Sequence, residues 1–311
     1  MQVISNIADW LTEQLLSGVV PDVVELGTSR FRRLRGTFAE GRFQIIEPAE
    51  VPAPKSFVCS PAIPLAVFDN QAFKEAFMKL FETHRPRHRY VAIILPDGIF
   101  HIGFSSISAV LLKSGVSSFI EREVQQTAPM PLGEYKVQFE IGAGKGNKKD
   151  LLFCCLAQKV FSELFELFEE MGFVPISIQP SFVNLMGAIK LLESDSSPHP
   201  SVLIHLGNEV TTVAIVLGGN IRRIQALPLG GVDFNKFLSR GLSIKDEEAE
   251  KLKFNEIILL EEPSEEAQLE IVAYRALEPL FTDLLQRIYG FLQIHSSEFP
   301  HEGSCLLYTS D

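Results

Sequence analysis

The sequence predicts an α/β fold of two domains, and three observations support this prediction. Apolar segments of strand length and of helix length alternate along the chain. A chain of 311 residues can bury two moderate cores. A strand-turn-strand pattern near the N-terminus recurs in the second half of the chain. This repeat is the most informative of the three, because it predicts two halves of similar construction.

Composition excludes several classes of protein. A net charge of −11 disfavours nucleic acid as a partner, because phosphate backbones repel an acidic surface. No apolar run approaches the ~18 residues of a membrane span, so we expect no direct span. The N-terminus lacks the basic and apolar regions of a signal peptide. The cysteines lack metal-ligand spacing and are too sparse for a disulfide scaffold, which suggests a reducing compartment. They are Cys59, Cys154, Cys155 and Cys305.

The first part of the chain predicts a helix followed by strands. Residues 3–16 form an apolar stripe at helical spacing, and we expect this helix to pack on its own domain or on a partner. Three short apolar segments predict strands near residues 22–27, 30–35 and 42–47. A proline-rich connection, "EPAEVPAPK", follows, and a helix is expected near 70–83.

The middle of the chain mixes strands and helices. The segment "YVAIILPDGIFHIGF" predicts two strands around a Pro-Asp-Gly turn. A helix near 116–127 precedes two strands, "YKVQFEI" and "LLFCCLA". In the latter, Cys154 and Cys155 should point to opposite faces as buried structural thiols. The glycine-rich loop Gly142–Asp150 leads into a strand and lacks phosphate-loop spacing, so we expect a solvated hairpin loop.

The predicted boundary between the two domains lies near residue 200. A helix at 158–171 carries an apolar face that includes Phe161, Phe165 and Phe168. A strand ("VPISIQPS") and a helix at 181–192 come next, and the polar stretch "SDSSPHP" then predicts a linker. We therefore expect a first domain at residues 1–199 and a second at 200–303.

The internal repeat pairs "VVELGTSRFRRLRGTFAEGRFQII" with "LIHLGNEVTTVAIVLGGNIRRI". Glu25 aligns with His205, and Gly27 aligns with Gly207. If the two hairpin turns face each other across a cleft, their backbone N–H groups can hold a phosphate chain from both sides. The alternative is that each turn only closes a hairpin.

The order and spacing of these motifs resemble the PilM family, actin-like cytoplasmic proteins of type IV pilus assembly machines that are related in fold to FtsA. The matching segments are "VVELGTSRFRRL", "VAIILPDGIFHIGF", "LIHLGNEVTTVAIV", "GGNIRRIQALPLGGVDF" and "LSIKDEEAEKLK". The resemblance spans roughly residues 20–295. It implies an actin-like, duplicated ribonuclease-H-like fold of two domains, with an inserted subdomain at about residues 86–172 and an incomplete second domain.

The resemblance also implies a nucleotide site shared by the two halves. Its matches in the first half are Glu25, Gly27, Thr28, Ser29 and Arg32. Its matches in the second half are Gly207, Asn208, Gly230, Gly231, Glu250 and Lys253. By this resemblance Arg32 reaches phosphate, the glycine pair precedes a helix whose N-terminus faces the nucleotide, and Glu250 and Lys253 contact the sugar or base. Without it, the last two residues would indicate only a solvated charged helix.

The sequence departs from the family where the metal would bind. The family's hairpins carry aspartate two residues before the glycine, and these carboxylates hold Mg²⁺ largely through water. Glu25 keeps the charge, whereas His205 does not, and Mg²⁺ prefers oxygen ligands. We therefore expect weak ATP binding at most, Mg²⁺ only together with ATP, no catalytic residue and little hydrolysis. The alternative for His205 is a hydrogen-bonded histidine at a strand end.

The last residues, "SCLLYTSD", resemble translated sequencing adapter more than protein sequence. We expect residues 304–311 to be a non-native tail on a truncated second domain and to pack on nothing. The last helix should then expose apolar positions. A genuine short tail is the alternative.

The function implied by the resemblance is that of a scaffold on the cytoplasmic face of the inner membrane. The implied partner is the cytoplasmic N-terminal tail of PilN, which would dock beside the inserted subdomain, together with other pilus or secretion machine proteins. One alternative is a kinase of the actin-like superfamily, which His205 disfavours because a kinase needs intact metal ligands. Another is the cytoplasmic domain of a GspL-like type II secretion protein.

Overall fold

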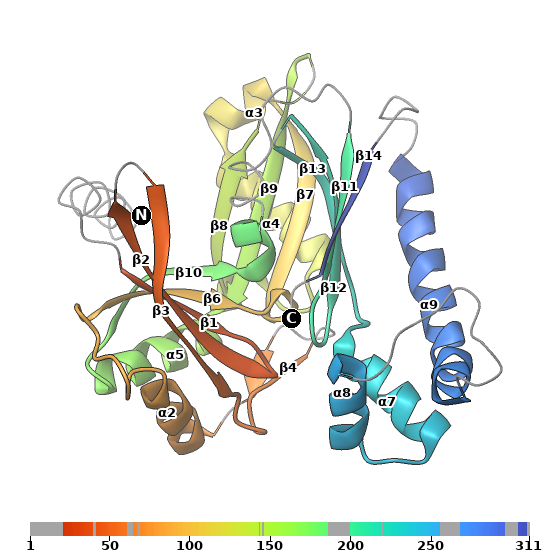
Figure 1. Cartoon of the computed structure of the whole chain (residues 1–311). Helices are drawn as coiled ribbons and strands as arrows, with labels where there is room; N and C mark the ends of the chain where they lie inside the picture. Colours follow the sequence, from red (N-terminus) through yellow and green to blue (C-terminus); the bar gives the residue numbers. More distant parts are fainter. Residues whose placement is uncertain are drawn as a thin grey trace. The chain divides into compact units, whose positions relative to one another are not determined.

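The computed structural model describes residues 21–39, 42–60, 65–67, 69–142, 144, 146–185, 200–218, 220–255, 268–295 and 304–309 (Figure 1). The chain divides into two compact units, Met1–Leu192 and Glu193–Asp311, close to the boundary predicted near residue 200. The predicted helix at residues 3–16 lies outside the described residues, as does most of the one at 181–192.

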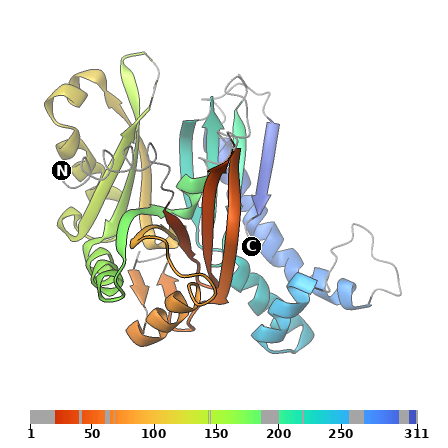
Figure 2. The ribbon, with the colours of Figure 1, turned by 60° about the vertical axis from the view of Figure 1, so that its left-hand side comes forward.

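The first unit is built on a five-stranded sheet with the order β10-β6-β1-β2-β3. Its strands are β1 (Asp22–Leu26), β2 (Arg30–Ala39), β3 (Arg42–Pro52), β6 (Tyr90–Leu95) and β10 (Val174–Pro180). The first three are antiparallel, β6 adds in parallel beside β1, and β10 adds in parallel beside β6. β2 and β3 run side by side as a long pair (Figure 2).

The predicted proline-rich connection is partly wrong, because β3 continues through Pro48 to Pro52. Proline cannot donate a backbone hydrogen bond, so it is confined to edge strands and bulges within sheets. β3 is at the edge of the described sheet, and it therefore accommodates both prolines. A two-stranded pair, β4 (Val58–Ser60) and β5 (Leu65–Val67), follows it.

Two helices, α2 (Asn70–Lys79) and α5 (Gln158–Glu170), supply the core on one face of this sheet. The Asp69 carboxylate caps α2 by accepting a hydrogen bond from the Ala72 N–H, at 2.8 Å. Phenylalanines from both helices and the adjoining strands pack edge to face in this core. They include Phe31, Phe57, Phe73, Phe77, Phe168 and Phe173.

A separate three-stranded sheet with the order β7-β9-β8 is inserted between β6 and α5. Its elements are the 3₁₀ turn Asp97–Ile99, β7 (Phe100–Ser108), α3 (Ala109–Ser114), α4 (Val116–Thr127), the 3₁₀ turn Leu132–Glu134, β8 (Tyr135–Ile141) and β9 (Lys148–Ala157). Its own core includes Phe119, Val124 and Phe153. This inserted sheet is narrower than the predicted insertion of 86–172, because β6 and α5 belong to the main core.

The two cysteines of β9 lie on opposite faces, as predicted. Cys155 is buried in the core of the inserted sheet, whereas Cys154 packs against the main core. Burial raises the pKa of Cys155 to about 12 and also raises that of Cys154. A thiol with a raised pKa forms little reactive thiolate, so both are structural cysteines.

The glycine-rich segment after β8 closes a hairpin. The N–H of Gly142 donates to the carbonyl of Asp150 at 2.8 Å, and the chain then continues along β9. The prediction that this segment is a hairpin loop is therefore confirmed.

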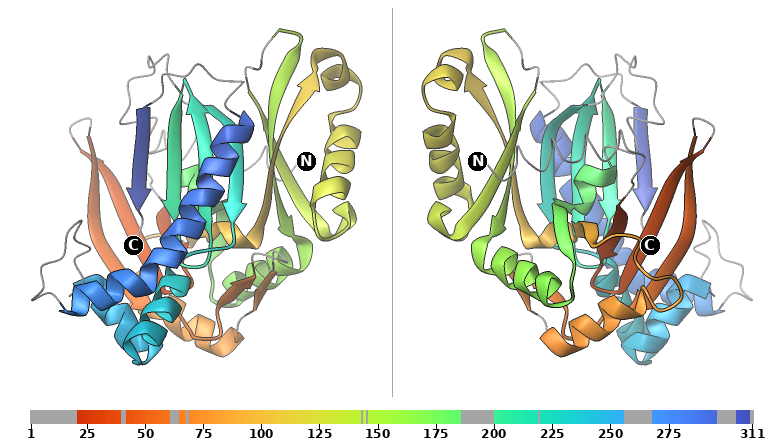
Figure 3. Two further views of the ribbon diagram at one scale, coloured as in Figure 1. Left: turned by 90° about the vertical axis from the view of Figure 1, so that its right-hand side faces the viewer. Right: turned by 90° about the vertical axis from the view of Figure 1, so that its left-hand side faces the viewer.

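The second unit contains a four-stranded sheet with the order β13-β12-β11-β14. Its elements are β11 (Ser201–Leu206), β12 (Thr211–Leu217), β13 (Asn220–Leu227), α7 (Gly231–Leu242), α8 (Asp246–Asn255), α9 (Gln268–His295) and β14 (Ser304–Thr309). The helices share one core with the sheet, and α9 runs across it (Figure 3).

The expectation that residues 304–311 pack on nothing is wrong. β14 pairs in parallel with β11, from Ser201 opposite Ser304 to Leu206 opposite Thr309. The hairpin partner β12 occupies only one side of β11, so the backbone N–H and C=O groups on the other side of β11 can pair with β14. The expectation for the last helix is confirmed, because α9 exposes large apolar side chains. They are Val272, Tyr274, Leu285, Tyr289 and Ile294.

The two units share a topology, which confirms the internal repeat. In each, three consecutive antiparallel strands are joined by a parallel strand beside the first of them. β1, β2, β3 and β6 thus correspond to β11, β12, β13 and β14, while β10 has no counterpart among the described strands of the second unit.

Candidate functional site

Each repeated hairpin turn begins with a glycine for the same steric reason. A Cβ atom on Gly27 would lie 2.8 Å from the carbonyl oxygen of Arg30. A Cβ atom on Gly207 would lie 2.9 Å from the carbonyl oxygen of Val210, which is also three residues further on. Real Cβ atoms essentially never approach an oxygen so closely, so only glycine fits either turn.

Glu25 and His205 occupy equivalent positions in the two sheets. The neighbours of Glu25 on β1, Val24 and Leu26, point into the helix-covered core. Ile204 on β11 does the same in the second unit. Because side chains alternate along a strand, Glu25 and His205 both lie on the sheet face opposite the helices. The alignment of these two residues in sequence therefore holds in geometry.

In the first unit, Glu25 belongs to a ladder of charges across three strands. The Nε of Arg32 donates to Oε2 of Glu50 at 2.8 Å, and its Nη1 lies 3.5 Å from Oε2 of Glu25. Arg30 also pairs with Glu50. Burial alone would lower the pKa of Arg32. The hydrogen bond to Glu50 and the negative charges of Glu25 and Glu50 have the larger effect, so the pKa of Arg32 is raised. A phosphate bound by Arg32 must therefore compete with both carboxylates.

In the second unit, the turn after β11 is joined to the start of α7. The N–H of Gly231 donates to the carbonyl of Gly207 at 2.9 Å, and the N–H of Val232 donates to that of Asn208 at 2.7 Å. A Cβ on Gly230 would lie 2.6 Å from the Asn208 carbonyl oxygen. The glycine pair thus permits close packing, and the first N–H groups of α7 are engaged by the turn.

The side chain of Lys253 on α8 reaches the junction between this turn and the start of α7. Its Nζ lies 3.4 Å from the carbonyl oxygen of Gly231 and 4.9 Å from the centre of the Phe254 ring. Glu250 lies on the same helix and is half-buried. The structure therefore brings five predicted residues together: Gly207, Asn208, Gly230, Gly231 and Lys253.

Sequence reasoning missed two residues near these turns. Glu50 holds Arg32 on β3, in the segment that the prolines suggested was a loop. The Asp233 carboxylate accepts from the Gly230 N–H at 3.1 Å and so caps the start of α7. The spacing from Gly230 to Asp233 is the sequence signal that could have identified this cap.

The described part of the chain contains neither a metal-binding cluster nor a membrane span. None of its groups of histidine, cysteine, aspartate and glutamate brings together three or more side chains that could hold a metal ion. None of its helices is long and apolar enough to cross a membrane.

Comparison with solved structures shows that the chain has an actin-like fold. A structure described as the PilM–PilN type IV pilus biogenesis complex is similar over 93% of this chain and 81% of that chain, with a TM-score of 0.76 and 17% sequence identity. At this identity the similarity establishes the fold, and it confirms the predicted resemblance to PilM at that level. No protein-family model and no curated protein matches the sequence.

Two other actin-like structures are less similar. The ethanolamine utilization protein EutJ from Carboxydothermus hydrogenoformans is 13% identical, with a TM-score of 0.49 over 98% of this chain and 85% of that chain. MreB5 of Spiroplasma citri bound to AMPPNP is 12% identical, with a TM-score of 0.45 over 88% of this chain and 79% of that chain. The fold assignment therefore rests on the first comparison.

Proposed function

We propose that this protein is a scaffold of a type IV pilus assembly machine that holds the cytoplasmic tail of a PilN-like inner-membrane protein. In this proposal it is cytoplasmic and peripheral to the inner membrane. The similarity in fold to the PilM of a PilM–PilN complex supports it. The observation that carries it is an open strand edge beside an aromatic helix face in the first unit.

This surface, which we call the α5–β8 face, consists of the outer edge of β8 together with Lys136, Phe161 and Phe165. β8 is an edge strand of the inserted sheet, and no described strand pairs with its outer side. The rings of Phe161 and Phe165 stack with centres 6.0 Å apart and remain partly exposed. The Nζ of Lys136 lies 5.8 Å from the centre of the Phe161 ring, which joins the strand to the helix.

The α5–β8 face has the chemistry to hold an extended peptide. The free backbone groups of β8 can pair with the peptide main chain, and the two rings can pack against alternate apolar side chains. Ordering a flexible tail offsets much of the contact energy, so a micromolar dissociation constant, about −8 kcal/mol, is expected.

Calorimetry with a synthetic peptide of the membrane protein's cytoplasmic tail tests this proposal. Phe165→Ala should weaken peptide binding about ten-fold or more, because aromatic anchors dominate such interfaces. Phe254→Ala on α8 is the control, since it removes an exposed phenylalanine ring from the second unit. Equal losses in both variants, or no binding to the unmodified protein, would contradict the proposal.

Point substitutions are a sharper test than deleting the predicted insertion. Removing residues 86–172 would take β6 out of the main sheet and α5 out of the main core. The first unit would then unfold, and a loss of peptide binding would not identify the binding surface.

We propose further that the protein binds ATP weakly and does not turn it over. The two glycine turns are retained, and in this proposal they face each other and hold phosphates. The donor set does not fit a metal, because Glu25 is paired with Arg32 and an imidazole replaces the second carboxylate.

Restoring the carboxylate tests the role of this position. His205→Asp should strengthen ATP binding in the presence of Mg²⁺ more than in its absence, whereas the similarly sized His205→Asn should show no such difference. The measurement is titration of ATP by calorimetry, with thermal unfolding to confirm that both variants fold. Steady ATP hydrolysis by the unmodified protein would refute the proposal.

A further inference from the structure

A short cationic loop lies between α2 and β6 on a chain whose net charge is −11. This arginine loop, residues 85–89, has the sequence Arg-Pro-Arg-His-Arg, and all five residues are exposed. None of its three guanidinium groups forms an ion pair with a described residue, although Arg89 lies over the ring of Tyr90. Three unneutralised arginines are therefore concentrated in five exposed residues.

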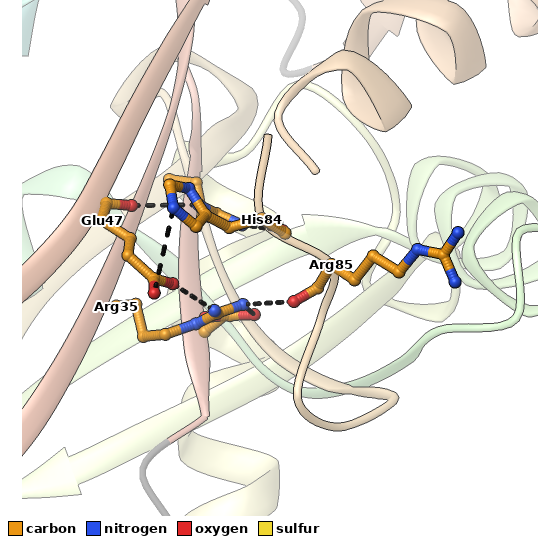
Figure 4. Close-up of polar contacts among 6 residues, drawn as sticks. Arg35, Glu47, His84 and Arg85 are labelled. Atoms are coloured by element: carbon orange, nitrogen blue, oxygen red, sulfur yellow. Dashed lines mark hydrogen bonds and ion pairs between the residues drawn. The ribbon is translucent and has the colours of Figure 1, made fainter. Parts of the chain in front are cut away.

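Buried arginines fix the backbone of this loop. The Nη1 of Arg33 donates to the carbonyl of His84 at 2.7 Å. The Nη2 of Arg35 donates to the carbonyl of Arg85 at 3.0 Å (Figure 4). At the other end, the N–H of Val174 donates to the carbonyl of Arg89 at 2.7 Å. Figure 4 shows the Arg85 side chain pointing away from the buried groups. The loop is thus held by its carbonyls and presents its side chains outward.

The arginine loop lies far along the sheet from the candidate nucleotide turn of the same unit. It enters β6 at the amino-terminal ends of three parallel strands, which begin at Asp22, Tyr90 and Val174. The Gly27 turn follows the carboxyl-terminal end of β1. The loop is therefore a separate surface, and the nucleotide proposal does not use it.

We propose that the arginine loop binds the phosphate headgroups of an anionic lipid bilayer. Guanidinium groups hold phosphate oxygens through two parallel hydrogen bonds. Lipids diffuse laterally, so separate headgroups can reach each arginine. An acidic protein partner is a poorer fit, because its affinity would depend on apolar anchors and the loop exposes no aromatic or aliphatic side chain except Pro86. Nucleic acid normally requires more phosphate contacts than three arginines supply.

The expected strength follows from the number of arginines. Each basic side chain close to an anionic bilayer strengthens binding by about five-fold, so three should contribute about 100-fold. Membrane binding of this strength is reversible, and stable anchoring requires a second attachment. Peptide docking on the α5–β8 face would supply that second attachment, but lipid binding by the loop does not depend on it.

Vesicle co-sedimentation of the full chain, without any peptide, tests this inference. The vesicles contain equal amounts of phosphatidylglycerol and phosphatidylcholine, and vesicles of phosphatidylcholine alone serve as the neutral comparison. The variant R85Q/R87Q/R89Q should bind the anionic vesicles about 100-fold more weakly than the unmodified protein. The matched control R122Q/R240Q/R275Q removes the same charge from exposed positions elsewhere and should retain binding.

A third variant distinguishes the effect of losing positive charge from the effect of disturbing the structure of the loop. R85K/R87K/R89K keeps the positive charges and should bind within a few-fold of the unmodified protein, and binding should fall as salt is added. Equal binding by the unmodified protein and the glutamine loop variant would overturn the inference. Equal binding to neutral vesicles, or no binding to anionic ones, would do the same. Since no peptide is present, none of these results bears on the docking proposal.

Discussion

Replacing Arg35 by methionine is expected to lower the free energy of unfolding by about 3–5 kcal/mol, because it leaves the buried Asp22 carboxylate without its cation. The side chains of Arg35 and Asp22 are each only 4% exposed. The guanidinium Nε and Nη2 donate to the two Asp22 oxygens at 2.6 and 2.9 Å, and Nη1 also pairs with Glu47. The hydrogen bonds that Arg35 donates to Asp22 raise the pKa of Arg35, although burial opposes this, and they keep the guanidinium charged.

Arg32→Met is the matched control for this prediction, since it changes the same residue type on the same strand. Arg32 is 29% exposed and its partner Glu50 is 40% exposed, so water screens the pair. The expected cost is below about 1 kcal/mol. Urea unfolding of both variants measures the difference. Similar costs for the two substitutions would show that Arg35 and Asp22 do not form a buried pair of this kind.

The repeat could be predicted from sequence because local interactions produce it. A glycine that avoids the carbonyl three residues ahead, between two apolar strands, is visible in a single sequence at Gly27 and at Gly207. The alternation of core and opposite faces then places Glu25 and His205 correctly. These features require no knowledge of distant residues.

The buried arginines could not be predicted in the same way. In "RFRRLR" the alternation of side chains places Arg33 and Arg35 on the face of Phe31, opposite Arg32, but it does not show which groups could neutralise two guanidinium groups in a core. The register shift against β3 between Arg33 and Arg35 places the extra residue on β3, where Glu47 accepts hydrogen bonds from both guanidinium groups. Their partners come from β1, β3 and the segment before the arginine loop. Long-range pairing of this kind is not encoded in a local pattern.

The candidate site was only partly predictable, because some of its contacts also join residues that are distant in the sequence. The glycines and Lys253 are recognisable one by one, but the bonds that occupy the α7 N–H groups depend on how the turn meets the helix. Glu50 was missed because its neighbouring prolines suggested a loop. β14 was missed because its sequence was interpreted as foreign, although its backbone pairs with β11.

Phe77→Ala on α2 should destabilise the first unit by about 3–5 kcal/mol, through lost burial and the cavity left behind. Phe77 is fully buried, and its ring centre lies 5.1 Å from that of Phe168 on α5 and 5.2 Å from that of Phe173. It therefore connects α2 to α5 and to the chain entering β10. Thermal and urea unfolding should both show the loss.

Phe165→Ala is the comparison that gives this result its functional meaning. Phe165 stacks on Phe161 at the partly exposed side of α5, so its removal should cost about 1 kcal/mol or less. Phe77→Ala should thus weaken the fold, whereas Phe165→Ala should weaken peptide binding in a folded protein. If Phe165→Ala destabilised the chain as much as Phe77→Ala, the aromatic pair would belong to the core, and the α5–β8 face would lose its status as a docking surface.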